Sequence, residues 1–108
     1  MIAAYSDVPA ASAIELGAVL AALADPLRRG VVVDLFGRDD DEHPCSSFNL
    51  PVAKSTRTYH WRVLRQAGLI TQRDAGNGSF VRLRRQELAS RFPGLIEVIH
   101  DATRSPQQ

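Results

Sequence analysis

The segment KSTRTYHWRVLRQAGLI, residues 54–70, constrains the fold of this chain more than any other. A helix turns by about 100° per residue, so it would gather two sets of side chains on opposite faces. The inner set is Arg57, His60, Trp61, Leu64, Ala67 and Gly68, and the outer set is Ser55, Thr58, Tyr59, Arg62 and Gln66. Gly68 is a natural helix end, because glycine readily adopts the left-handed conformation found there. We therefore predict a helix that packs one face inward and presents a polar, basic face to solvent.

Three residues of the inner face carry separate predictions. We expect Trp61 in the core, and we expect His60 to be a structural histidine rather than a metal ligand. Arg57 lies near the start of the helix, where its charge must either extend to solvent or find a partner.

The next segment, LITQRDAGNGSFVRLRR, predicts a β-hairpin. Two short runs with strand-forming residues flank Gly76-Asn77-Gly78-Ser79, which has the turn chemistry that a hairpin requires. Arg73 precedes the turn, and Arg82 and Arg84 follow it. A polar-faced helix followed by a basic hairpin is typical of a winged helix-turn-helix.

The N-terminal half predicts two further helices. Ser12 and Glu15 fit a capping box, in which each side chain accepts a hydrogen bond from a backbone N–H at the helix start. The helix behind them, through residue 24, is apolar and nearly uncharged, so the core and a second surface must cover it. Asp25-Pro26 then fits the N-cap and first position of another helix, which Gly37 ends.

The remaining segments complete a mostly α fold with one small hairpin. Residues 46–50 fit a short helical turn that Pro51 limits, residues 86–92 fit a short helix, and Pro93 fits the start of the last helix. We predict an α+β winged helix-turn-helix in a single domain, residues 1–108. The helix-turn-helix spans 46–68, the wing spans 69–85, and the two apolar terminal helices span 12–24 and 93–103.

Composition narrows the functional class. The single cysteine, Cys45, allows no intrachain disulfide, and no apolar run approaches the roughly 18–20 residues that span a bilayer. The N-terminal residues lack the basic region of a signal peptide and include Asp7, so we expect a cytoplasmic protein. Nothing indicates an enzyme, since the chain has no nucleophile–base pair in a recognisable context, no glycine-rich phosphate loop and no paired carboxylates.

Charge is distributed unevenly, although the formal net charge is only +1. Residues 54–91 hold nine basic and two acidic side chains, a balance of +7, and the rest hold four basic and ten acidic, a balance of −6. A concentrated positive region, rather than a positive total, is typical of nucleic-acid-binding proteins. A merely solvated surface would show the same split, so the helical spacing of the polar face decides in favour of a polyanionic partner.

Three strings also resemble one known family. LAALADPLRRGVVVDLF resembles a signature in the second helix region of the ArsR/SmtB transcriptional regulators, and KSTRTYHWRVLRQAGLI resembles their recognition helix. RRQELASRFPGLIEVI is similar to the approach to the last helix in one branch of that family. The resemblance covers roughly Leu20 to Ile99 and is more specific for the family than for what is sensed.

Membership would imply a homodimer held by the first and last helices, which would cover their apolar surfaces. Two recognition helices would then lie about one DNA turn apart, roughly 34 Å, matching a near-palindromic operator. Such regulators typically leave DNA when an effector, often a metal ion, binds. The expected partners are therefore double-stranded operator DNA and a second copy of the chain.

The expected DNA contacts come from the predicted helix and wing. Hydroxyls near a helix N-terminus bind phosphates or base edges, and arginine either holds a guanine or neutralises a phosphate. The helix contributes Lys54, Ser55, Thr56, Thr58, Tyr59 and Arg62, and the wing contributes Arg73, Arg82 and Arg84. Arg57 stands where the family usually has an aliphatic residue, so no DNA role is assigned to it.

The resemblance implies two candidate metal sites, of which the first lies before the helix-turn-helix. The family's Cys-x-Cys pair corresponds here to His43-Pro44-Cys45, with Glu42 before it. An imidazole and a thiolate suit Zn, Ni or Cu, but they do not complete a tetrahedral site. A further donor would have to come from Asp7 or from the other subunit.

The second candidate site lies on the last helix. Glu97, His100 and Asp101 fall at i, i+3 and i+4, and a two-fold axis would double them into a site for Ni or Zn. Without either site, two alternatives stay open: a winged helix that docks on an acidic protein, and a regulator that senses oxidants through Cys45.

Overall fold

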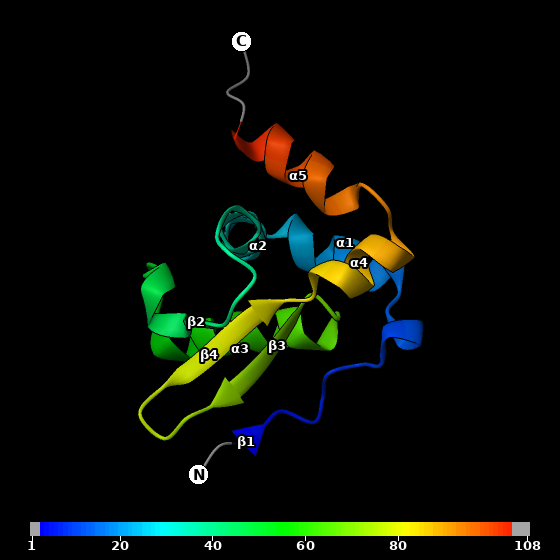
Figure 1. Cartoon of the computed structure of the whole chain (residues 1–108). Coiled ribbons are helices and arrows are strands. Elements are labelled where there is room, and N and C mark those ends of the chain that lie inside the picture. Colours follow the sequence, from blue (N-terminus) through cyan, green and yellow to red (C-terminus); the bar gives the residue numbers. More distant parts are fainter. Residues whose placement is uncertain (1–2, 105–108) are drawn as a thin grey trace.

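The computed structural model describes residues 3–104 and has a helical body from which a hairpin projects (Figure 1). Besides the predicted helices and hairpin, the structure contains two-residue strands and short 3-10 helices, which are marked η. All elements, in chain order, are β1 (Ala3–Ala4), η1 (Ala11–Ala13), α1 (Leu16–Ala24), α2 (Pro26–Gly37), β2 (His43–Pro44), η2 (Cys45–Phe48), α3 (Lys54–Gln66), β3 (Ile70–Asp74), β4 (Ser79–Leu83), α4 (Arg85–Arg91) and α5 (Leu95–Arg104). No helix within this described part is long and apolar enough to cross a membrane.

One hydrophobic core joins the helices to the inner face of the sheet. Its largest fully buried side chains are Ile14, Leu35, Leu64, Leu69, Ile70, Leu88, Val19, Val32 and Val81. Trp61 is also buried, as predicted, and packs edge-on against Phe48 with ring centroids 5.5 Å apart. This core fixes α3 against the hairpin, so the outer face of α3 has one defined orientation relative to the wing.

The sheet is antiparallel, with the strand order β1-β3-β4-β2. Side chains alternate across a strand, so Gln72 and Val81, which are paired, lie on the buried face. Arg73 and Arg82 lie on the outer face. The predicted turn is confirmed between β3 and β4, where Gly76 has a φ of +82° that glycine tolerates best.

The first helix begins later than predicted. Ser12 lies in η1, and α1 begins at Leu16 with Glu15 at its N-cap and no side-chain cap hydrogen bond, so the capping-box prediction is wrong. Between the two elements, Ile14 has an extended backbone, a fully buried side chain, and a carbonyl that accepts from Arg91. Burying Ile14 in the core requires this extended link, which a continuous helix would not allow.

The other helix ends follow the sequence more closely. The Asp25 carboxylate accepts from the backbone N–H groups of Leu27 and Arg28 at 2.8 and 3.1 Å, with Pro26 at the first position of α2, as predicted. The last helix begins at Leu95 rather than Pro93, because Gly94, with a φ of +83°, interrupts the helical backbone between them.

Gly68 ends α3 as predicted, with a φ of +88°. A Cβ at this position would lie 2.6 Å from Cγ1 of Ile14, closer than packed atoms allow. The turn from α3 into β3 therefore depends on glycine both for its backbone conformation and for the close packing of Ile14.

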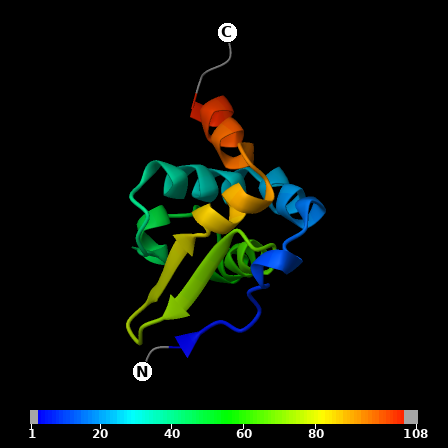
Figure 2. The same cartoon turned by 45° about the vertical axis from the view of Figure 1, so that its right-hand side comes forward.

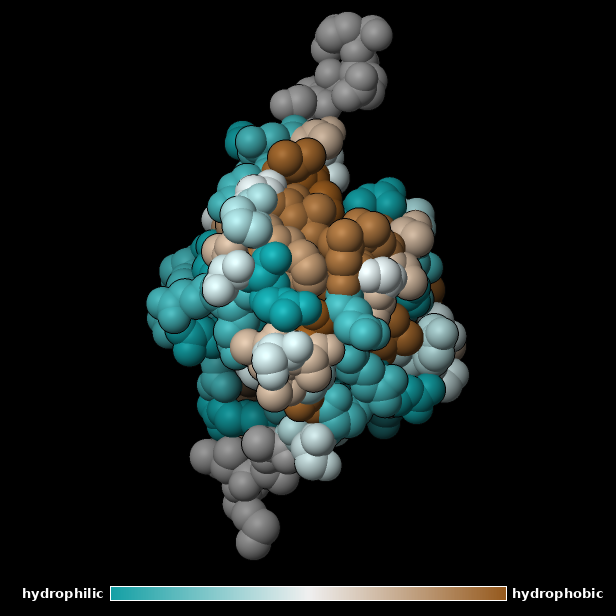
Figure 3. All heavy atoms as spheres, turned by 90° about the vertical axis from the view of Figure 1, so that its right-hand side faces the viewer, coloured by the Kyte–Doolittle hydropathy of each residue, from teal (hydrophilic) through white to brown (hydrophobic). Residues whose placement is uncertain are grey.

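The two terminal helices both pack on α2, and α5 lies beyond it at the end opposite the hairpin (Figures 1 and 2). Each leaves large apolar side chains in solvent: Leu16 and Leu20, the latter 47% exposed, on α1, and Val98, 66% exposed, on α5. Figure 3 shows apolar side chains gathered in the upper part of one face of the molecule. We define Leu16, Leu20 and Val98 as the terminal apolar surface.

Candidate nucleic-acid interface

The outward face of α3 is open to solvent over its first three turns. Its exposed side chains are those expected from the sequence: Lys54, Ser55, Thr56, Thr58, Tyr59 and Arg62. The Thr58 hydroxyl donates to the Lys54 carbonyl at 3.0 Å, and the Arg62 guanidinium lies 5.4 Å from the centroid of the Tyr59 ring. Arg62 is exposed and makes no hydrogen bond within residues 3–104, so its N–H donors are available to a ligand.

The beginning of α3 is suited to an anion. Its N-cap residue, Ala53, has no side chain that can accept from the first backbone N–H groups of the helix. Free N–H groups and the helix dipole attract negative charge at this end. Lys54, the first residue of the helix, adds a positive side chain there, so a DNA phosphate would meet complementary chemistry.

The inner face of α3 holds its two polar residues in place. Arg57 donates to the Val52 carbonyl at 2.7 Å, so it finds a partner, as the sequence required. His60 is buried, and its Nδ1 lies 3.2 Å from Nη1 of Arg28, as expected for a structural histidine. Arg28 also donates to the Ala22 carbonyl at 2.8 Å, which ties the end of α1 to α3.

Near the end of α3, Arg65 anchors the N-terminal arm. Its Nε and Nη2 donate to Asp7 at 3.0 and 3.1 Å, its Nη1 donates to Gln72 at 2.6 Å, and its guanidinium lies 4.0 Å from the Tyr5 ring centroid. The hydrogen bonds from Arg65 hold the pKa of Asp7 below its usual value. Asp7, considered above as a metal donor, is therefore engaged by α3 in the described structure.

Both arginines on the outer face of the wing form ion pairs. Arg73 contacts Glu42 with its Nη2 2.6 Å from Oε1, and Arg82 contacts Asp40 with its Nη2 3.3 Å from Oδ2. Hydrogen bonds from these arginines lower the pKa of both carboxyl groups. The expected basic surface of the wing is thus partly neutralised by residues from the loop after α2.

Arg84 corrects the expectation of a third DNA-binding arginine in the wing. Its side chain is 5% exposed, donates to Glu87 at 2.8 and 3.0 Å, and donates to the Pro9 carbonyl at 2.7 Å. The strand β4 ends at Leu83, and Arg84 leaves the extended conformation with a ψ of 63°. The alternation that keeps Arg82 outside therefore stops, and Arg84 turns inward.

Comparison with known proteins finds a similar arrangement in a solved structure. A solved structure, the ArsR-like transcriptional regulator from Rhodococcus sp. RHA1, is similar to the chain with a TM-score of 0.56 and 26% identity, covering 88% of this chain and 89% of that one. The chain has a winged-helix fold and resembles this ArsR-like regulator. No family model and no curated protein sequence matches it. The resemblance and the winged-helix fold expected from the sequence are confirmed.

In this ArsR-like protein, the first candidate metal site has its residues engaged elsewhere. His43 Nε2 lies 3.0 Å from Oδ1 of Asp39, and Cys45 Sγ accepts from Nε2 of Gln72 at 3.8 Å. Burial raises the pKa of the Cys45 thiol to about 12, which disfavours the thiolate that a metal requires.

The second candidate site is divided between a packed and an exposed surface. His100 packs edge-on against Phe36 of α2, with ring centroids 5.0 Å apart, and its Nδ1 lies 3.1 Å from Oδ1 of Asp101. Glu97 and Asp101 are exposed. Within residues 3–104 of one chain, no group of three or more His, Cys, Asp or Glu side chains is arranged to hold a metal ion.

The sequence did not reveal how much of the positive charge is used inside this ArsR-like fold. Arg85, for example, donates from Nη2 to the carbonyls of Leu35 and Arg38, both at 2.7 Å, and so caps the end of α2. Five of the nine basic residues between 54 and 91 hold backbone carbonyls or buried acceptors: Arg57, Arg65, Arg84, Arg85 and Arg91. Charge counts along the sequence therefore overstate the basic surface.

Proposed function

We propose that the protein is a transcriptional regulator that binds operator DNA by inserting the outward face of α3 into the major groove. The observation that carries this proposal is the exposed polar face of α3, with its uncapped N-terminus, in an ArsR-like winged helix. Lys54, Ser55 and Thr56 meet phosphates at the helix start, whereas Thr58, Tyr59 and Arg62 face the bases. The similarity to a transcriptional regulator supports a DNA-binding role rather than an enzymatic one.

Direct binding tests this proposal. The purified protein is titrated with a duplex carrying the region upstream of its own gene and with a scrambled duplex, at about 50 mM and 200 mM salt. We expect a preference for the upstream duplex and a strong loss of affinity at the higher salt. Equal affinity for both duplexes would contradict sequence-specific binding.

The variant Arg62→Ala tests whether the outward face of α3 reads bases. Its expected cost is about 1–3 kcal/mol on the upstream duplex and much less on the scrambled one. Arg104→Ala is the matched control, because it removes the same charge from the exposed end of α5. An equal loss on both duplexes would reduce Arg62 to a phosphate contact.

We further propose that the protein binds as a homodimer through α1 and α5. The terminal apolar surface supports this, since large side chains left in solvent need a partner. Light scattering at micromolar concentration should give twice the chain mass, and Leu20→Glu should give a monomer with much weaker operator binding. A monomeric wild-type protein would remove the argument for paired half-sites.

Control by an effector completes the proposal, with Ni or Zn as the first to test. Because the described donors of one chain form no closed site, a metal would need ligands from both subunits or from the N-terminal residues. The upstream duplex is titrated with metal-stripped protein, with and without Ni or Zn. A tenfold change, about 1.4 kcal/mol of coupling, that disappears in His43→Ala or His100→Ala would assign the site.

A further inference from the structure

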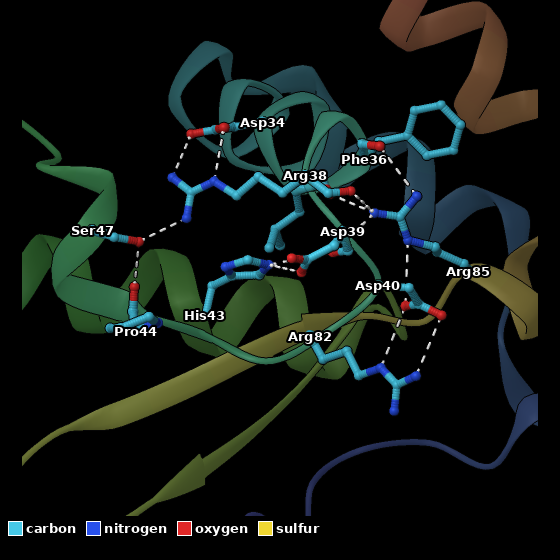
Figure 4. A network of polar contacts seen from close by, with 11 residues as sticks. Asp34, Phe36, Arg38, Asp39, Asp40, His43, Pro44, Ser47, Arg82 and Arg85 are labelled. Atoms are coloured by element: carbon cyan, nitrogen blue, oxygen red, sulfur yellow. Dashed lines mark hydrogen bonds and ion pairs between the residues drawn. The ribbon is translucent and has the colours of Figure 1, made fainter.

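An acidic segment, residues 39–42, lies beside the wing, and Figure 4 shows its Asp40 between Arg82 and Arg85. The strand β2 follows it directly and pairs with β4, His43 opposite Val81. Both ends of the segment are fastened. Arg38 binds Asp34 with its Nε and Nη2, each 3.0 Å from a carboxylate oxygen, and His43 Nε2 lies 3.0 Å from Oδ1 of Asp39. The pairing of β2 with β4 and these two contacts therefore place the acidic segment beside β4.

Two of its carboxylates occupy the wing arginines. Glu42 accepts from Arg73 Nε with both oxygens at 2.9 Å and from Nη2 at 2.6 Å. Asp40 lies between two guanidinium groups, 3.3 Å from Arg82 Nη2 and 3.3 Å from Arg85 Nε. Asp41, between them, pairs with no basic side chain in the described structure.

The same arginines remain within reach of an outside ligand. The Arg73 and Arg82 side chains are 30% and 51% exposed. A carboxylate and a phosphate bind a guanidinium in the same forked geometry, so each arginine can fully engage only one of them. Exposed ion pairs of this kind contribute little to folding stability, so the exchange is not prevented by the fold.

We propose that Asp40 and Glu42 act as internal competitors of DNA phosphates for Arg82 and Arg73, and so set the affinity of the wing for DNA. The inference rests on the proposed DNA-binding function. When a phosphate displaces Glu42 from Arg73, the freed carboxylate takes up a solvent cation. That uptake offsets part of the counterion release from DNA, so the salt dependence of binding is shallower than two free arginines would give.

The test compares three single substitutions in the full chain: Glu42→Gln, Asp40→Asn and, as the matched control, Asp41→Asn. Each removes one negative charge from the same segment, but only the first two release an arginine. Binding is measured on the upstream and the scrambled duplex at about 50 mM and 200 mM salt. We expect Glu42→Gln and Asp40→Asn to tighten binding by about two- to fivefold on both duplexes, with a steeper salt dependence. Asp41→Asn should change little.

A second background separates release of an arginine from a general change in charge. In an Arg73→Ala protein, Glu42→Gln should no longer tighten binding, because the arginine it would release is absent. In the same way, Arg82→Ala should abolish the effect of Asp40→Asn. Thermal unfolding of each variant checks that the exposed substitutions leave the fold intact.

Three outcomes would overturn the inference: equal effects of Glu42→Gln, Asp40→Asn and Asp41→Asn; persistence of the gain in the arginine-deleted backgrounds; or weaker binding after release. The last would mean that the acidic segment positions the arginines for DNA. If the proposed function itself is wrong, the wild-type protein shows no preference for the upstream duplex, which distinguishes that result from the three above. The phosphate contacts of the wing are independent of sequence, so the gain on both duplexes would still be measurable.

Discussion

The outward face of α3 and the outer face of the wing both carry polar and basic residues, but they differ in whether those residues are already paired within the fold. On α3, the Thr58 hydroxyl donates to the Lys54 carbonyl of the same helix, the Arg62 guanidinium lies near the Tyr59 ring, and both residues are exposed. On the wing, Arg73 and Arg82 are matched by Glu42 and Asp40 from a distant loop. A basic residue on a surface is available to DNA only to the extent that the fold has not already paired it.

The substitution Gly68→Ala would break the junction between these two faces and should have the largest effect. The new Cβ would overlap Ile14, and the φ of +88° would be strained for alanine. We expect a loss of about 3 kcal/mol in the free energy of unfolding, measured by urea denaturation. The helical residue Gly30 has nothing within 4 Å of a new Cβ, so Gly30→Ala is the control and should not destabilise the protein.

Asp7→Asn would loosen the arm that is anchored on α3 and leave the Arg65 charge without its partner. The pair is only partly buried, so we expect a loss of about 1–2 kcal/mol in unfolding free energy. Because Arg65 lowers the pKa of Asp7 from its usual 3.8, this contribution is present above about pH 4 and is lost as the pH falls through the folded-state pKa. Unfolding curves of the two proteins should therefore converge in acid; a constant difference would exclude the ion pair.

Arg73→Ala measures how much a paired wing arginine contributes to DNA binding. If Glu42 already occupies Arg73, its removal should weaken DNA binding by about threefold or less, which is smaller than the effect of Arg62→Ala. Both variants are titrated against the upstream duplex in parallel. If Arg73→Ala lost as much affinity for the duplex as Arg62→Ala, the two faces would contribute equally to binding, and the prediction would be wrong.

The smallest predicted effect concerns the reactivity of the Cys45 thiol, which belongs to neither of the two faces. Burial raises its pKa to about 12, so at pH 8 only a minute fraction is thiolate. Alkylation by iodoacetamide should be far slower than for a free thiol and should become rapid on unfolding. Fast reaction of the folded protein would reopen oxidant sensing at this residue.

Local signals predicted the elements that depend on nearby residues. Helical spacing placed Trp61 and His60 on the inner face of α3, and glycine positions predicted both the end of α3 at Gly68 and the turn of the hairpin. The start of α1 was wrong because the capping pattern of Ser12 is local, whereas the burial of Ile14 against Gly68 links residues far apart in the chain. Tertiary packing decided between two locally acceptable conformations.

Ion pairs between residues far apart in the chain could not be predicted from the sequence. Arg84 was assigned to DNA because it follows the hairpin turn within the predicted wing, yet the strand ends one residue earlier. Residues 39–42 were given no ion-pair partner in the prediction, although a block of four acidic residues in a chain with one basic half is a signal for such a partner. Which arginine each carboxylate meets follows only from the pairing of β2 with β4.

The strand β1 protects one edge of the sheet from pairing with other chains. Ala3 and Ala4 pair with Asp74 and Arg73, so the arm covers the free side of β3. A strand whose side is uncovered offers its backbone N–H and C=O groups to any other chain. Removing residues 1–7 would therefore turn the hairpin into a template for intermolecular β-pairing, and we expect the shortened protein to aggregate during storage while its helices remain folded.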